Sequence, residues 1–155
     1  MEDESPYEIA VARLCGHTST ADAGLYEAIA AALLRHNVQA ARVSVALVDD
    51  ARIAELNEKH LGHKGPTDVI TFDLRDDRDA QVDGELVLSV ETAAREAKRR
   101  GHGVDAELAL YAIHGILHLL GYDDLSKDDS DRIHEVEDEI LTEIGVGPIY
   151  KVDMR

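Results

Sequence analysis

The chain has 155 residues, enough for one domain with a sizeable core, and no apolar run approaches the roughly 20 residues of a membrane span. Acidic residues outnumber basic ones 32 to 16, and the net charge of -16 argues against broad adhesion to nucleic acid or to an anionic membrane. Cys15 is the sole cysteine, and the acidic N-terminus does not resemble a secretory signal. We therefore expect a single domain over residues 1–155, cytoplasmic and without a membrane partner.

The first half of the chain predicts two strands and two helices. Alternating apolar residues predict a strand over residues 7–14, and an alanine-rich segment predicts a helix over residues 21–36. A second strand is expected over residues 42–48, with alternate side chains on one face. A helix should then run from residue 51 to Gly62, a residue suited to ending it.

The second half predicts two more strands and three helices. A third strand is expected around residues 69–72 and a fourth over residues 85–90, paired across a charged surface loop. A helix should follow through Arg100, and an amphipathic helix with an apolar stripe should occupy residues 126–145. The chain is therefore predicted to be an α+β domain in which a four-stranded mixed sheet packs with about five helices.

The segment between Asp105 and Asp124 is the most apolar in the chain and indicates a buried central helix. Leucine, isoleucine and alanine cover nearly every side of it, with Asp105 as the expected N-cap. Gly121 follows, the residue that most readily takes the left-handed conformation at a helix end. The chain should then turn back toward the helix.

His114 and His118 lie four residues apart in this helix, so both imidazoles should share one face. With Asp123 and Asp124 directly after the turn, two nitrogens and a carboxylate oxygen are three ligands of a zinc-type ion, leaving a fourth position for water. Burying two imidazoles costs free energy unless their nitrogens are engaged, which favours a metal site. The alternatives are core histidines held by hydrogen bonds and ordinary aspartates of a turn.

Gly115 separates this helix from that of metalloproteases, in which a glutamate general base follows the first histidine. Without that carboxylate, a protease mechanism lacks its proton acceptor. A glycine also leaves room for a backbone or a substrate to approach the metal.

The residues from His114 to Asp123 resemble the signature of the YbeY-type family of metal-dependent endoribonucleases, His-Gly-x-Leu-His-Leu-x-Gly-Tyr-Asp-His. In that family the three histidines bind zinc, which implies one zinc ion here, held by His114, His118 and Asp124 in the last position. A carboxylate makes the site more tolerant of other divalent metals. Residues 56–72 and 84–89 also resemble the family, although its phosphate-contacting arginine falls on Leu61.

The resemblance implies a hydrolase that cleaves single-stranded RNA or rRNA, acting in rRNA 3'-end maturation and ribosome quality control, with ribosomal proteins as further partners. Asp123 is the candidate catalytic residue, either orienting a ligand histidine or serving as a base. The candidates for the substrate cleft are His63, Lys64, Thr67 and Asp68. Two alternatives remain: a non-catalytic ribosome assembly factor with the same fold and metal, and a metal-dependent hydrolase of another substrate. The sequence does not indicate an oligomeric state.

The other polar residues of interest have simpler interpretations. His17, His36, His102 and His134 are expected at the surface. The basic cluster of Arg95, Lys98, Arg99 and Arg100 is either a solvated helix face or an RNA contact.

Overall fold

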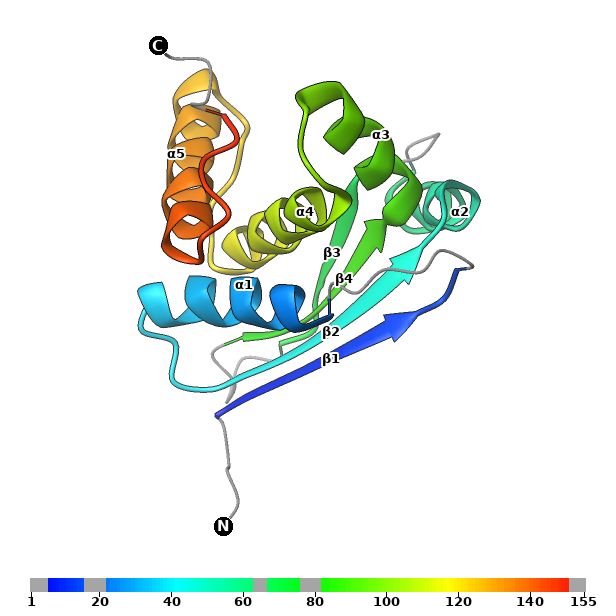
Figure 1. Cartoon of the computed structure of the whole chain (residues 1–155). Helices are drawn as coiled ribbons and strands as arrows, with labels where there is room; N and C mark the ends of the chain where they lie inside the picture. Colours follow the sequence, from blue (N-terminus) through cyan, green and yellow to red (C-terminus); the bar gives the residue numbers. More distant parts are fainter. Residues whose placement is uncertain (1–5, 16–21, 63–66, 76–81, 151–155) are drawn as a thin grey trace.

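The computed structural model describes residues 6–15, 22–62, 67–75 and 82–150. Its elements follow the predicted order, and Figure 1 shows helices packed on a twisted sheet, with α2 on the side opposite α1 and α4. They are β1 (Tyr7–Arg13), α1 (Asp22–Arg35), β2 (Ala41–Val48), α2 (Asp50–Leu61), β3 (Val69–Asp73), β4 (Val82–Ser89), α3 (Val90–Arg100), α4 (Val104–Leu119) and α5 (Lys127–Glu143).

The sheet has the strand order β1-β2-β4-β3 and is mixed. β1 and β4 both pair with β2 in parallel, whereas β3 pairs with β4 antiparallel, placing Ile70 opposite Val87. The predicted α+β fold and the pairing of the third strand with the fourth are therefore confirmed. The fourth strand begins at Val82, earlier than predicted, and Val90 already belongs to α3.

Both faces of the sheet carry apolar side chains, because successive residues of a strand point to opposite sides. Val43, Val45 and Leu47 join the large core beneath α1, α3, α4 and α5. On the other face, Ala46 and Val48 form a smaller cluster with Ile53 of α2. Within the described residues, no helix is both long and apolar enough to cross a membrane.

α4 is the central helix of the larger layer, as predicted. It packs against α1, α3, α5 and the strands β3 and β4, and eleven of its residues are buried. Its N-cap is Gly103, so the prediction that Asp105 caps the helix is wrong. The helix therefore starts two residues earlier than predicted, and the buried carboxylate of Glu107 in its first turn meets the His102 ring at 2.5 Å. This tertiary contact outweighs the local preference for an aspartate cap.

Two glycines allow α4 to lie close to the sheet. A Cβ on Gly115 would come within 2.7 Å of Leu86 Cδ2 and 3.2 Å of Thr71 Oγ1, and a Cβ on Gly84 would come within 2.7 Å of Leu119 Cδ1. The prediction that Gly115 leaves room for a substrate is therefore wrong, because side chains of the sheet fill that space.

Candidate metal centre

The C-terminal end of α4 brings together three potential metal ligands. His114 and His118 lie on one face of the helix, with their Nε2 atoms 2.9 Å apart. The helix ends at Leu119, and Gly121, with a φ of 106°, lets the chain reverse so that the Tyr122 N–H bonds the Leu117 carbonyl. Asp124 Oδ2 then lies 3.9 Å from His114 Nε2 and 4.0 Å from His118 Nε2.

The donor set suits a zinc-type ion. Two imidazole nitrogens and a carboxylate oxygen are typical zinc ligands, and bonds of about 2.0–2.2 Å in a tetrahedron would separate the donor atoms by about 3.3–3.5 Å. The three observed separations fall on both sides of this range, so shifts of less than an ångström would suffice. Two ring nitrogens facing each other also need a proton or a cation between their lone pairs.

A fourth residue, Glu137 of α5, lies behind the cluster. This fully buried glutamate accepts a hydrogen bond from His114 Nδ1 at 2.5 Å through Oε2 and one from His134 Nδ1 at 3.1 Å through Oε1. A carboxylate can only accept, so Nδ1 of His114 carries a hydrogen and Nε2 is left to face the other ligands. Sequence reasoning missed Glu137, although an acid within the apolar stripe of α5 signals a buried partner.

These contacts shift the pKa values of the cluster. Burial lowers the pKa of His114, but the hydrogen bond and charge of Glu137 raise it more, and the net shift is upward. For His118, burial and the nearby charge of His114 lower the pKa. Burial raises the pKa of Glu137, yet its bonds to His114 and His134 bring it below the ordinary value. Glu137 therefore remains ionised as the acceptor for both rings.

The cluster opens into a groove of about 460 Å³ between α4 and β3. Thr67 and Asp68, two of the predicted cleft residues, line this groove beside the three ligand candidates, as do Thr71 and Asp73. The predicted cleft residues His63 and Lys64 lie outside the described residues. Arg75 lies at the groove's edge, where it bonds the Asp73 carboxylate at 2.6 Å and the Leu119 carbonyl at 3.1 Å.

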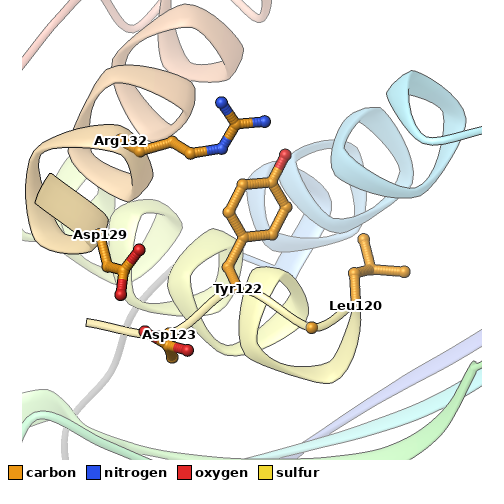
Figure 2. A pocket seen from close by; sticks show the side chains of 6 residues that line it. Leu120, Tyr122, Asp123, Asp129 and Arg132 are labelled. Carbon is orange, nitrogen blue, oxygen red and sulfur yellow. The ribbon is translucent and has the colours of Figure 1, made fainter. Parts of the chain in front are cut away.

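Asp123, the candidate catalytic residue, lies on a different side of the turn. It lines a separate hollow of about 360 Å³ with Asp129 and Arg132, and Figure 2 shows Arg132 reaching over the Tyr122 ring from α5. Its Oδ1 accepts a hydrogen bond from the Leu125 N–H at 3.2 Å. Glu137, rather than Asp123, contacts a ligand histidine in the described structure.

The predicted surface histidines are more engaged than expected. His36 bonds the Tyr122 hydroxyl at 2.8 Å, His102 bonds the buried Glu107, and His134 bonds Glu137 and stacks on Tyr150 at 3.8 Å. The prediction of simple surface positions is wrong for these three, which are half-buried, and His17 lies outside the described residues.

The basic cluster on α3 is divided between surface and interior. Arg95 bonds Asp50 at 2.6 Å and Arg99 bonds Glu96 at 2.5 Å, both on the exposed face. Arg100, by contrast, points inward toward Glu107 and the Tyr150 ring. The interpretation as a solvated helix face therefore holds for the exposed residues Arg95, Lys98 and Arg99 but not for Arg100.

Comparison with known proteins agrees with this geometry. The family model described as "Endoribonuclease YbeY" matches residues 16–145. A protein of that name from Carboxydothermus hydrogenoformans is 41% identical over 113 residues, covering 73% of this chain and 79% of the relative. Another, from Bacillus cereus, is 35% identical over 127 residues, covering 76% and 81%. The solution structure of TM1509 from Thermotoga maritima has a TM-score of 0.56 at 28% identity, covering 92% of this chain and 97% of that one.

Proposed function

The chain belongs to the endoribonuclease YbeY family, and from this premise we propose that it is a metal-dependent endoribonuclease. Its substrate would be single-stranded RNA, in rRNA 3'-end maturation and ribosome quality control. Residues 1–155 would form one domain that carries this activity. Both relatives described above carry the name endoribonuclease, which supports the RNA substrate.

One observation carries the proposal: His114, His118 and Asp124 converge at the floor of an open groove while Glu137 fixes the His114 ring from behind. Ligand histidines commonly donate their second ring nitrogen to a carboxylate, which fixes the tautomer and raises the basicity of the ligating nitrogen. A pair of core histidines would need no groove beside it. The arrangement supports a binding site for an ion that a substrate can reach.

The residues of the site would have three roles: binding the metal, orienting a ligand and shaping the RNA cleft. We assign His114, His118 and Asp124 as ligands of one zinc ion, and other divalent metals are compatible with the carboxylate. When bound, such an ion supplies Lewis acidity toward a phosphoryl oxygen and lowers the pKa of a water molecule. Glu137 holds the proton on His114 Nδ1 so that Nε2 stays available. Thr67 and Asp68, with His63 and Lys64 from the preceding segment, would shape the RNA cleft.

We keep Asp123 as the candidate proton acceptor, although its side chain lines a hollow separate from the metal groove and would have to turn toward the groove to act there. Its carboxylate lies on the turn between the last ligand histidine and Asp124, within reach of the solvent. For the alternative role of orienting a ligand histidine, Glu137 is the stronger candidate, since it contacts His114 Nδ1. An Asp123→Asn variant that keeps its metal but loses RNA cleavage would support the proton-acceptor role.

A second function, a non-catalytic ribosome assembly factor, is favoured by the charge of -16 and by the leucine at position 61. An acidic surface suits docking to basic ribosomal proteins, and leucine cannot donate hydrogen bonds to phosphate. In this case the metal and the fold would be retained without cleavage.

The first test is RNA cleavage by purified protein with and without a chelator, alongside elemental analysis of the metal. Cleavage that stops on chelation and returns with zinc supports the nuclease, whereas unchanged cleavage excludes a metal mechanism. If the native protein is inert and the double variant Leu61→Arg and Asp124→His cleaves RNA, the assembly factor becomes the better description.

A further inference from the structure

Polar side chains continue along α4 beyond the two ligand candidates. Glu107, Tyr111, His114 and His118 are spaced four, three and four residues apart, so they form one stripe on a helix that is otherwise apolar. Glu107 and Tyr111 are both buried. The stripe leads from the metal cluster toward the start of the helix.

A second hollow lies along this stripe, beside the groove of the metal cluster. It has a volume of about 240 Å³, and its walls come from four parts of the fold: Asp68, Arg100, Tyr111 and Tyr150, with His114 and Asp124 at the boundary to the groove. Asp68, His114 and Asp124 line both hollows. A molecule held at the metal cluster can therefore extend directly into the second hollow. We call this second hollow the base recess.

Three buried polar atoms at or near the base recess make no hydrogen bond in the described structure: Arg100 Nε, Glu107 Oε2 and the Tyr111 hydroxyl. Arg100 and Tyr111 line the recess, whereas Glu107 lies behind it, with Oε2 3.8 Å from Arg100 Nε. Tyr111 is 3% exposed and Glu107 is fully buried, so bulk water does not satisfy them. Unsatisfied buried groups are rare and costly in native proteins. A buried polar group beside such a hollow can be satisfied by polar atoms of a bound molecule.

The charges around the base recess argue against a phosphate as that occupant. Two carboxylates, Asp68 and Asp124, line it with the rings of His114 and His134. The one guanidinium, that of Arg100, already lies 3.8 Å from both Glu96 and Glu107, so no free positive charge is available for an anion among the described lining residues. A neutral, planar group with both acceptors and donors on one edge fits better.

We propose that the base recess binds one nucleobase of the RNA, next to the phosphate at the metal cluster, and that it prefers the keto bases guanine and uracil. This inference rests on the proposed function. A keto base places a carbonyl oxygen beside a ring N–H on one edge. The carbonyl oxygen would accept hydrogen bonds from Tyr111 and Arg100, and the ring N–H would donate to the Asp68 carboxylate. In the same orientation, adenine and cytosine would place an amino donor against Arg100, which can only donate, and a ring acceptor against the Asp68 carboxylate, which can only accept.

The test is fluorescence anisotropy with labelled RNA hexamers in which one position at a time holds A, C, G or U in an adenine background. Binding is measured with chelator-treated protein and with zinc-loaded protein. At one position we expect guanine and uracil to bind about five- to tenfold more tightly, the worth of one or two buried hydrogen bonds. Tyr111→Phe removes just the hydroxyl and should abolish this preference, whereas Tyr26→Phe on the exposed face of α1 should preserve it.

Equal binding of the four bases, or no measurable binding in either state, overturns the base recess. A preference that survives in Tyr111→Phe, with the variant's thermal unfolding unchanged, overturns it as well and leaves the unpaired atoms to an internal water molecule. Cleavage of the same hexamers by the zinc-loaded protein is followed separately. Cleavage without base preference supports the proposed function and overturns the base recess. Base preference without cleavage supports the base recess and counts against the nuclease.

Discussion

Oε2 of Glu137 lies 2.5 Å from Nδ1 of His114, which joins α5 to α4 through a buried carboxylate and a partly buried imidazole. The same carboxylate reaches His134 through its other oxygen, so both oxygens are engaged inside an apolar layer. A buried charge needs such partners to be tolerated. Glu137 therefore serves both the packing of α5 and the orientation of a candidate ligand.

Replacing Glu137 with glutamine should weaken metal binding while preserving the three ligands. An amide is a weaker acceptor and no longer favours the required tautomer of His114, so we expect zinc affinity to fall about 10- to 100-fold. Zinc competition with a chromophoric chelator measures this. Glu139→Gln, on the exposed side of α5, is the matched control and should retain the affinity. Unchanged affinity in Glu137→Gln would show that the contact is merely structural.

Removing the carboxylate of Asp124 should deplete the protein of metal without unfolding it. The Asp124 side chain is 47% exposed, so Asp124→Ala should have little effect on stability. Elemental analysis of protein purified without added metal should give near one zinc per chain for the native protein and much less for the variant. Asp128→Ala is the control, and Asp124→His should restore binding. Equal zinc in Asp124→Ala would remove Asp124 from the ligand set.

Gly84 should tolerate no side chain. A Cβ there would lie 2.7 Å from Leu119 Cδ1 and 2.9 Å from the Phe72 carbonyl oxygen, so Gly84→Ala must displace α4 or β3. We expect the free energy of unfolding to fall by about 1–3 kcal/mol. Urea denaturation followed by circular dichroism measures it. Gly24→Ala, in open space on α1, should instead gain up to about 1 kcal/mol. A stable Gly84→Ala variant would contradict the close packing.

Asp50 should make stability depend on acidic pH. Burial raises its pKa, but hydrogen bonds from Ser89, Arg95 and Thr92 lower it more, so the folded-state pKa is below the ordinary value. The unfolded chain then binds more protons in this range, and the contribution to stability is present above the unfolded pKa and lost as pH falls through the folded pKa. Denaturation from pH 7 to pH 3 should therefore show a smaller loss in Asp50→Asn than in native protein or in the Asp128→Asn control. Parallel curves for all three proteins would count against this role of Asp50.

Most of the helices and strands could be predicted from the sequence, because alternating apolar residues and helix-ending residues are local patterns. The strand containing Val43, Val45 and Leu47 and the helix end at Gly62 follow from alternation and from backbone preference. The strand order could not be predicted, since β2 pairs with β4 across residues far apart in the chain. The start of α4 was misplaced because burial of Glu107 overrode the preference for Asp105 as a cap.

The candidate site divides in the same way. His114 and His118 are four residues apart, so helical geometry alone predicts that their rings meet. The position of Glu137 in the apolar stripe of α5 signals a buried partner, but which residue it meets depends on how α5 packs against α4. No local pattern specifies that packing, so the ligand candidates could be predicted and the contact that supports His114 could not.

All three ligand candidates lie between residues 114 and 124, a segment short enough to gather its donors without the remainder of the fold. An ion that binds the native state alone stabilises it by mass action, but affinity for the unfolded chain subtracts from that gain. A helical turn of α4 with its reversal already contains every donor, so the denatured ensemble should compete for zinc. We therefore expect zinc to raise the melting temperature less than its native-state affinity would imply, because loss of the fold does not scatter the ligands.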